Sequence, residues 1–432
     1  MSYYDQATET LSRDALGALQ LAKLREMLTE LWGKNRFYTE KWTRAGLQPG
    51  DIRSLADLAH LPLTTKSELM ADQAANAPFG TNLTYPIDRY IRIHQTSGTT
   101  GVPLKVLDTA DSWNWWGKCW AHVLSGSGVT AGDRVFLAFA FGPFIGFWAA
   151  MEGARRIGAM MIPGGGRDSA QRLELMRDTG ATVLCCTPTY ALRLGEVARE
   201  TGFDLHSIHL KSTVHAGEPG ANIPATKQRI ESLWSAKCFD HAGASEIGAH
   251  SFECEVQPGG THIIESEFIA EVIDPASGAA VAPGQRGELV ITNLGRWGFP
   301  LIRYRTGDLV QMNLDPCACG RGFLRLEGGI LGRADDMVTV RGVNVFPAGV
   351  ENIIRKFTEV DEFRITVSRV RHMDEMDVEV ELCEGADDKV VHAIAERLDT
   401  MLSFRPRVHH VSHNALPRFD MKAKRFHVSR TL

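Results

Sequence analysis

The stretch from Thr96 to Lys105 holds the residues of this chain that are best suited to chemistry. It reads Thr-Ser-Gly-Thr-Thr-Gly-Val-Pro-Leu-Lys and follows residues 90–94, a run typical of a β-strand. Glycines permit positive φ, so neighbouring amides can turn toward one point, and hydroxyls add donors that suit a polyphosphate. The Gly-x-x-x-x-Gly-Lys-Ser/Thr spacing of the P-loop is absent, and a plain polar turn is the alternative interpretation.

Later segments carry carboxylates, hydroxyls and cations that suit the same chemistry. Residues 240–246, Asp-His-Ala-Gly-Ala-Ser-Glu, place a hydroxyl beside a carboxylate, and a carboxylate near polyphosphate commonly binds Mg²⁺. Residues 303–308 end in an aspartate suited to a ribose diol, and residues 416–425 present a lysine on a C-terminal loop. Residues 332–336, Gly-Arg-Ala-Asp-Asp, mark a change in composition. Each segment alone also fits a helix cap, a turn or a solvated face.

The elements that must position these loops alternate between strands and helices. Residues 134–139, 159–162, 183–186 and 211–215 are apolar strand-like runs, and residues 169–179 and 189–201 read as helices. This alternation predicts an α/β fold with parallel sheets flanked by helices. Ligands in such folds bind at the carboxyl ends of the strands.

The pattern changes twice toward the C-terminus. From about Phe268, runs at 268–273, 287–292 and 301–304 predict a more antiparallel, barrel-like section. Beyond residues 332–336 the order of elements is βαββαβ, which predicts a small ferredoxin-like α+β domain. Its elements are strands 337–341, 364–370, 377–382 and 407–411 and helices 347–357 and 386–403. We therefore expect a large domain over residues 1–333 and a small one over residues 334–432.

Composition excludes some classes of function. The net charge is −5 without any Lys/Arg run, which argues against a nucleic-acid-binding surface. The only membrane-like stretch, residues 135–151, is short and interrupted by Gly142 and Pro143, so we expect no membrane span. No apolar signal segment opens the sequence, and we expect a cytoplasmic protein.

Cys254, His262, Cys317 and Cys319 form a candidate metal site. A Cys₃His set matches a closed structural Zn²⁺ site, and a cysteine cluster without a disulfide framework favours metal. The spacing, Cys-x₇-His with a remote Cys-x-Cys, is not that of a zinc finger. The alternative is four ordinary buried side chains.

Taken together, these segments resemble the adenylate-forming acyl-CoA ligase superfamily, and within it the phenylacetate–CoA ligase branch. The resemblance extends from Leu-Pro-Leu-Thr-Thr-Lys at residues 61–66 to Arg425 and is most specific at 95–103, 287–308 and 332–347. It implies two half-reactions. A carboxylate attacks the α-phosphate of ATP to give an acyl-adenylate and pyrophosphate, and coenzyme A then displaces AMP.

The resemblance also implies roles for individual residues in the reaction. Ser245 would contact the α-phosphate, Glu246 would hold Mg²⁺, and Lys422 would stabilise the charge of the adenylation transition state. Asp335 would be the hinge of a mobile small domain. The residues implied to bind the β- and γ-phosphates are Thr96, Ser97, Gly98, Thr99, Thr100 and Gly101. Those implied to contact the rest of the nucleotide are Glu218, Pro219, Asp240, Ala242, Asp308 and Arg333.

The substrate is expected to be a small aromatic acid. The acyl pocket implied by the resemblance comprises Phe139, Phe141, Phe144, Ala216, Gly217 and Ala242. Phe147 and Trp148 follow the first three rings, although an aromatic stripe can equally be core. Ala242 replaces the tyrosine usual in the family, which leaves space for an acid at least as bulky as phenylacetate, such as indoleacetate. Met421 replaces a glycine expected before the lysine.

Other functions stay open at this point. The chain could load a carrier protein or another nucleophile in place of coenzyme A, or it could bind nucleotide without catalysis. A zinc-dependent nucleic-acid-binding protein is disfavoured by the acidic charge balance. We expect ATP, Mg²⁺ and coenzyme A as ligands on the strength of the resemblance, structural Zn²⁺ at the Cys₃His set, and a homodimer as the assembly.

Overall fold

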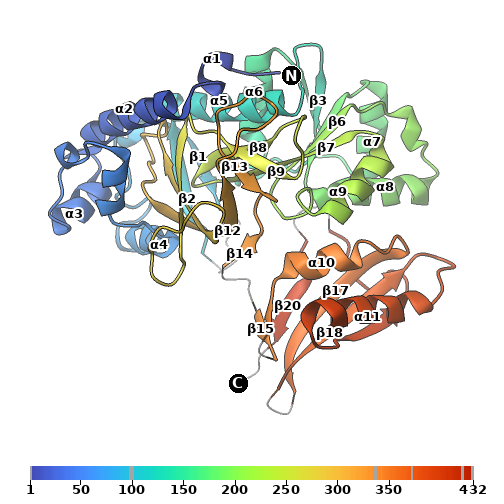
Figure 1. Cartoon of the computed structure of the whole chain (residues 1–432). Helices are drawn as coiled ribbons and strands as arrows, with labels where there is room; N and C mark the ends of the chain where they lie inside the picture. The colour runs from blue at the N-terminus through green and yellow to red at the C-terminus, as the bar shows by residue number, and fades with distance from the viewer. Residues whose placement is uncertain are drawn as a thin grey trace.

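A large domain and a small C-terminal domain make up the protein (Figure 1). The computed structural model describes residues 2–96, 102–334, 338–341, 343–370, 373–419 and 423–429. The two-domain α/β architecture confirms the predicted fold class. The boundary at residue 333 stays a prediction, because Asp335, the expected hinge, lies outside the described residues. Among the described helices, none is both long and apolar enough to span a membrane.

Helices near the N-terminus cover one end of the large domain (Figure 1). Side chains that accept from free backbone amides fix where they begin: Ser12 Oγ accepts from the Ala15 amide, and Asn35 Oδ1 from the Tyr38 amide. These helices are α1 (Gln6–Glu9), α2 (Arg13–Leu31), α3 (Arg36–Arg44) and α4 (Lys66–Ala75).

The parallel half of the central sheet follows the predicted alternation. Its strands lie in the order β7-β6-β5-β3-β4, with helices between them in sequence. The strands are β3 (Arg134–Leu137), β4 (Met160–Pro163), β5 (Val183–Cys186), β6 (Ser212–His215) and β7 (Lys237–Ala244). The helices are α6 (Trp148–Ile157), α7 (Ser169–Asp178), α8 (Pro188–Thr201) and α9 (Pro224–Trp234). The carboxyl end of β6 therefore lies beside the middle of β7, with His215 paired to Asp240.

The same sheet continues as antiparallel strands, and this part begins at β8, earlier than the predicted change at Phe268. Residues 301–303, predicted as strand, lie outside any strand, because Arg303 adopts a φ of 47° that a strand cannot contain. The strands are β8 (Gly248–Glu253), β9 (Gly260–Ile263), β10 (Phe268–Ile273), β11 (Arg286–Asn293), β12 (Tyr304–Asn313), β13 (Arg325–Glu327) and β14 (Gly332–Arg333).

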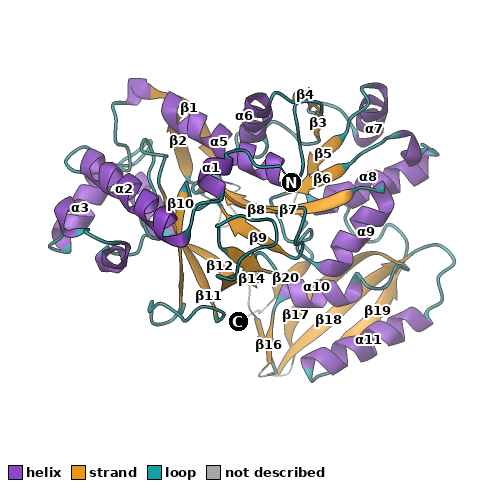
Figure 2. Ribbon diagram, turned by 45° about the horizontal axis from the view of Figure 1, so that its top comes forward, coloured by secondary structure: helices purple, strands orange, loops and turns teal. Residues whose placement is uncertain are grey.

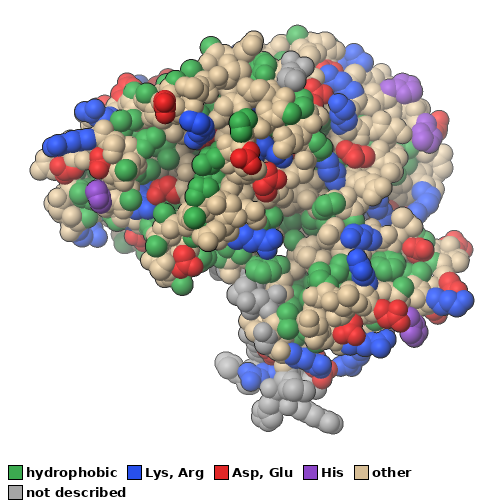
Figure 3. Space-filling view, in the orientation of Figure 1, with side chains coloured by type: hydrophobic (Ala, Val, Ile, Leu, Met, Phe, Trp, Pro, Cys, Tyr) green, Lys and Arg blue, Asp and Glu red, His purple; other side chains and the backbone are tan. Residues whose placement is uncertain are grey.

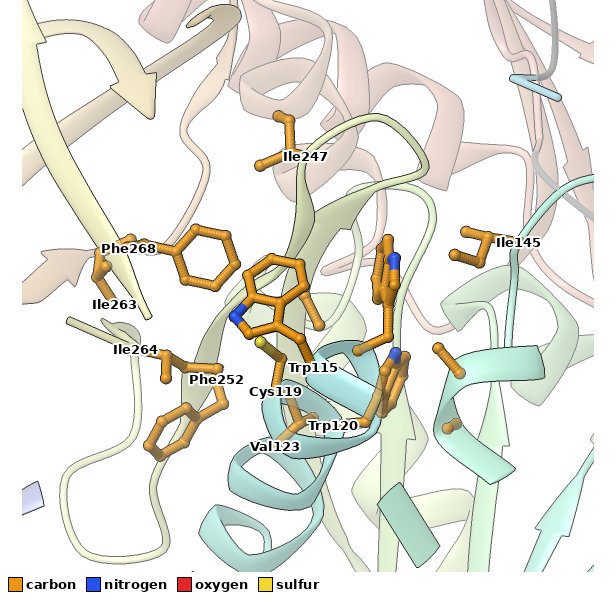
Figure 4. Packing of buried hydrophobic residues seen from close by; sticks show 14 of the residues in the cluster. Trp115, Cys119, Trp120, Val123, Ile145, Ile247, Phe252, Ile263, Ile264 and Phe268 are labelled. Carbon is orange, nitrogen blue, oxygen red and sulfur yellow. The ribbon is translucent and has the colours of Figure 1, made fainter. Parts of the chain in front are cut away.

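The core of the large domain is built around helix α5 (Ala110–Gly126). Figure 4 shows Trp115, Cys119 and Trp120 of this helix among apolar side chains from distant strands. The ring centroids of Trp115 and Phe268 are 5.1 Å apart, and those of Trp120 and Phe147 are 5.7 Å apart. Buried aromatic rings contribute large apolar areas, so this packing gives the loops of the sheet a rigid base.

The small domain has the predicted α+β content (Figure 2). The predicted first strand, however, is not part of its main sheet. Its sheet order is β19-β18-β17-β20, while β15 and β16 form a separate ribbon. Residues 338–340 of the predicted first strand pair with β16 in that ribbon, and β20, which was not predicted, pairs with β17 in parallel. The elements are β15 (Val338–Val340), β16 (Val343–Val345), α10 (Pro347–Ile354), β17 (Val360–Val370), β18 (Met373–Leu382), α11 (Lys389–Leu402), β19 (Arg407–Val411) and β20 (Phe426–Ser429).

Candidate active site

The glycine-rich loop is carried by a two-stranded hairpin of β1 (Tyr90–Gln95) and β2 (Lys105–Thr109). Thr96 closes the base of the loop. Its amide donates to the Leu104 carbonyl at 3.0 Å, and its Oγ1 accepts from the Leu104 amide at 3.0 Å. Ser97, Gly98, Thr99, Thr100 and Gly101 lie outside the described residues. Thr96 therefore has a structural role at the neck of the loop.

A buried arginine connects this hairpin to the Ser245–Glu246 turn. Arg296 pairs with Asp108, which lies on β2, and both side chains are completely buried. The Nε and Nη2 atoms of Arg296 each donate to an Asp108 oxygen at 2.7 Å. Its Nη1 donates to the Ser245 and Glu246 carbonyls at 2.8 and 2.9 Å. The guanidinium thus joins strand β2 to the Ser245–Glu246 turn. A lone arginine carries no sequence signal for such a position, and neither Arg296 nor Asp108 was predicted.

Glu246 presents its carboxylate in a small polar cluster. The carboxylate is buried, and its Oε1 accepts from the Tyr304 hydroxyl at 3.1 Å and lies 3.3 Å from Lys66 Nζ. Burial beside Glu246 raises the pKa of Tyr304 well above its usual value, so this hydroxyl stays a donor. The segment that carries Lys66 lies beside Tyr304, because Thr64 pairs with Tyr304 across a parallel bridge. Both residues fall in segments that the resemblance marked, although neither had a predicted role.

Asp308 and Arg333 come together on adjacent strands. They are paired residues of β12 and β14, and Arg333 Nη1 lies 3.3 Å from Asp308 Oδ1 and donates to the Thr306 carbonyl at 3.1 Å. Gly307, which precedes Asp308 on β12, has a φ of 76°, and a Cβ there would lie 2.6 Å from Arg333 Nη2. Glycine is therefore required where this arginine crosses the strand.

Four of the residues predicted to contact the nucleotide lie just after β6 or within β7. Asn222 Nδ2 donates to the Ile330 carbonyl at 2.6 Å, which joins the loop after β6 to the turn at residues 328–330. Burial, and secondarily the charge of Glu253, raises the pKa of Asp240 to about 7. Glu218 is partly buried, and burial likewise raises its pKa. Ala242 is partly buried on β7, and Pro219 is exposed.

The predicted acyl-pocket rings form one cluster between β3 and α6. The Phe139 ring lies 4.4 Å from Phe141, 5.7 Å from Phe144 and 5.3 Å from Phe147, and Phe141 lies 4.8 Å from Trp148. Phe139 and Phe141 are only partly buried, and Ala216, at the end of β6, packs against the same core cluster. Gly217, the next residue, is exposed.

Cys254, His262, Cys317 and Cys319 converge as a buried group, as the sequence predicted, with their ligand atoms within 4.8 Å of one another. Cys254 Sγ lies 3.8 Å from Cys317 Sγ, and Cys319 Sγ lies 3.4 Å from His262 Nε2. Zn–S and Zn–N bonds of about 2.3 and 2.0 Å in a tetrahedron require separations of about 3.8 and 3.5 Å. His262 Nδ1 lies 3.0 Å from the Phe323 carbonyl, which leaves Nε2 facing the sulfurs. The donor set fits tetrahedral Zn²⁺.

The sequence matches a known protein family. The family described as AMP-binding enzyme matches residues 60–295, and the one described as AMP-binding enzyme C-terminal domain matches residues 342–430. Phenylacetate-coenzyme A ligase of Escherichia coli (strain K12) is 34% identical over 428 residues, which cover 96% of this chain and 95% of the relative.

Solved structures of 2-hydroxyisobutyryl-CoA ligase are similar over nearly the whole chain. The postadenylation state with 2-HIB-AMP gives a TM-score of 0.93 at 32% identity, covering 98% of this chain and 92% of the other. The thioesterification state with 2-HIB-AMP and CoA gives 0.76 at 33% identity, covering 99% and 92%. The domains of this protein are thus arranged much as in the postadenylation state. The chain belongs to the AMP-binding enzyme family and is an AMP-forming acyl-CoA ligase.

Proposed function

We propose that this ligase activates an aromatic carboxylic acid, an arylacetate or aryl carboxylate such as phenylacetate or indoleacetate, and transfers it to coenzyme A. The observation that carries this proposal is the cluster of phenylalanine rings at Phe139, Phe141, Phe144 and Phe147, in which Phe139 and Phe141 are only partly buried. Flat rings pack favourably edge-to-face against one another, so the cluster suits an aromatic acid. Similarity to phenylacetate-CoA ligases supports the same substrate class.

In the proposed first half-reaction, a carboxylate oxygen of the acid attacks the α-phosphorus of ATP. The bond from that phosphorus to the bridging oxygen breaks, and pyrophosphate leaves. The loop at residues 96–101 would bind the departing phosphates, and Ser245 would contact the α-phosphate. Glu246 would hold Mg²⁺, which supplies positive charge to the phosphates when bound. Lys66, 3.3 Å from Glu246, adds a cation from the large domain.

In the proposed second half-reaction, the thiolate of coenzyme A attacks the acyl carbon and the bond to AMP breaks. Asp308 and Arg333 would hold the ribose side of the nucleotide, and Glu218, Pro219, Asp240 and Ala242 would surround the base. Rotation of the small domain about Asp335 would first remove Lys422 from the phosphate. Both residues lie outside the described part of the chain.

Pyrophosphate release with a panel of acids tests the proposed substrate. Benzoate, phenylacetate, indoleacetate, naphthoate, hexanoate and 2-hydroxyisobutyrate would each be supplied with ATP and Mg²⁺. We expect kcat/KM for the best aryl acid to exceed that for hexanoate by at least about tenfold, because a ring in an aromatic pocket gains on the order of 1.5 kcal/mol. A preference for hexanoate or for the short hydroxy acid would contradict the proposal.

We infer that the buried Cys₃His group binds structural Zn²⁺. Purified, untagged protein should contain about one equivalent of zinc, and the Cys317→Ser/Cys319→Ser variant less than about a tenth, since metal affinity depends on the full ligand set. The variant should also melt at a lower temperature, because binding energy at such a site stabilises the fold. Cys383→Ser is the matched control, since Cys383 lies outside the group. Less than about a tenth of an equivalent in the unmodified protein would overturn the inference.

A further inference from the structure

The contact between the two domains is polar. Arg199 Nη2 lies 3.5 Å from Asp361 Oδ1, Arg229 Nη1 donates to the Val360 carbonyl at 2.8 Å, and Arg425 Nη1 donates to Thr189 Oγ1 at 3.2 Å. Among the described residues, no cluster of buried apolar side chains includes members of both domains. Interfaces of this kind separate readily, so a few hydrogen bonds decide how the small domain is oriented.

One carboxylate joins the two domains next to the expected catalytic lysine. Glu218 Oε1 accepts from the Thr189 amide at 2.9 Å, and Glu218 Oε2 accepts from the Ala423 amide at 2.6 Å. Thr189 is the second residue of α8, where backbone amides have no partner within the helix and the helix dipole favours an anion. Ala423 directly follows Lys422 in the chain. The Glu218 side chain thus ties the backbone after Lys422 to the large domain.

The side chain must be a carboxylate of this length to make both bonds. Two amide donors require two acceptor oxygens, and a glutamine would turn an NH₂ group toward one of them. An aspartate would be one methylene shorter on a fixed loop. Arg425 stands nearby as a cation, bound to Thr189 Oγ1 and paired with Glu362 at 2.6 Å. Charge and hydrogen bonding therefore both favour an ionised Glu218 in this arrangement.

Burial acts in the opposite direction. It disfavours the charged form of Glu218 and is the largest effect, so the pKa of Glu218 is raised. The hydrogen bonds from Thr189 and Ala423 and the charge of Arg425 lower the pKa and offset part of this effect. A cavity of about 220 Å³ also lies between the domains, lined by Arg425 and Glu362 among others. The two hydrogen bonds of Glu218 are short, but the cost of burying its charge offsets much of their free energy. A small net free energy suits a contact that must break within each catalytic cycle.

We propose that Glu218 is a positioning residue that fixes the lysine loop for adenylation and releases it for thioester formation. The proposal rests on the proposed function and extends it, because the resemblance implies for Glu218 only a contact to the nucleotide. The arrangement of the domains, close to a postadenylation state, is the one in which such a contact would act. Small-domain rotation would separate Glu218 from Ala423 and leave the loop after β6 in place.

The two half-reactions, measured separately, test this proposal. Glu218→Ala should lower kcat for acid-dependent pyrophosphate release by at least about tenfold, while KM for ATP changes by less than about threefold. Thioester formation from supplied acyl-adenylate and coenzyme A should stay within about twofold of the unmodified enzyme. Glu218→Gln, isosteric and able to keep one amide bond, should give an intermediate loss in the first step alone. Glu40→Ala, which removes an exposed glutamate paired with Arg36 and Arg44 of α3 in the large domain, is the matched control and should leave both rates unchanged.

Several results would overturn the proposal. Equal losses in both half-reactions would assign Glu218 to folding. A rise in KM for ATP that accounts for the whole effect would assign it to nucleotide binding. An unchanged adenylation rate would show that Glu218 does not position the lysine loop. If Glu218→Ala fails to fold, the isosteric Glu218→Gln decides by the same criteria. Absence of pyrophosphate release from the unmodified enzyme with every acid would refute the proposed function instead, so the two failures are distinguishable.

Discussion

Replacement of Lys422 by alanine should abolish adenylation and leave thioester formation from supplied acyl-adenylate intact. A fixed cation that stabilises a transition-state charge contributes about 3–4 kcal/mol or more, so the first step should slow by at least about a hundredfold. The second step should be spared, because the small domain is expected to have rotated the lysine away by then. Single-turnover assays of the two steps measure both rates.

Lys424→Ala is the control for the Lys422 assignment, because this second lysine lies two residues further along the same loop. It should change neither half-reaction by more than about threefold. A larger effect from Lys424 than from Lys422 would transfer the role to Lys424. Equal loss of both half-reactions in Lys422→Ala would contradict the assigned role.

Arg296→Met should destabilise the large domain and impair adenylation together. The substitution leaves Asp108 charged and buried without a partner, and it removes donors from the Ser245 and Glu246 carbonyls. Breaking a buried pair in this way costs about 3–5 kcal/mol in the free energy of unfolding. Chemical denaturation measures that loss, and pyrophosphate release measures the activity that accompanies it.

A double variant separates the two contributions of Arg296. Arg296→Met/Asp108→Leu removes the stranded charge, so it should regain part of the lost stability without regaining activity, because the Ser245–Glu246 turn stays unanchored. Lys34→Ala, which breaks an exposed pair with Glu30, is the control and should not change stability measurably. A double variant no more stable than Arg296→Met would contradict the buried-charge explanation.

The sequence was most informative where chemistry restricts the residue type. Cys254 and Cys317 are 63 residues apart, yet their sulfurs lie 3.8 Å from each other, and the scarcity of Cys/His clusters was enough to predict the group. The strands at Phe268–Ile273 and Arg407–Val411 match their predicted limits because alternating or β-branched runs end at turn residues. Such signals are local.

The errors come from contacts between distant residues. Residues 301–303 read as strand, but the Arg303 side chain reaches Glu271 at 2.9 Å and the Leu61 carbonyl at 2.7 Å and holds a positive φ. Strand β20 was missed because its partner, β17, lies some 60 residues earlier and nothing local predicts a parallel pair. Arg296 was missed for a similar reason, since burial of a charge depends on its remote partner.

Pyrophosphate release with the acid as the only variable tests the central claim most directly. The enzyme would be supplied with ATP and Mg²⁺, without coenzyme A, and the acyl-adenylate detected by mass spectrometry. With an arylacetate or aryl carboxylate we expect pyrophosphate and the corresponding acyl-adenylate in equal amounts. Without an acid we expect neither product. Addition of coenzyme A should then convert the adenylate to thioester and AMP. Pyrophosphate release that does not depend on the acid, or none with any aromatic acid, would contradict the account.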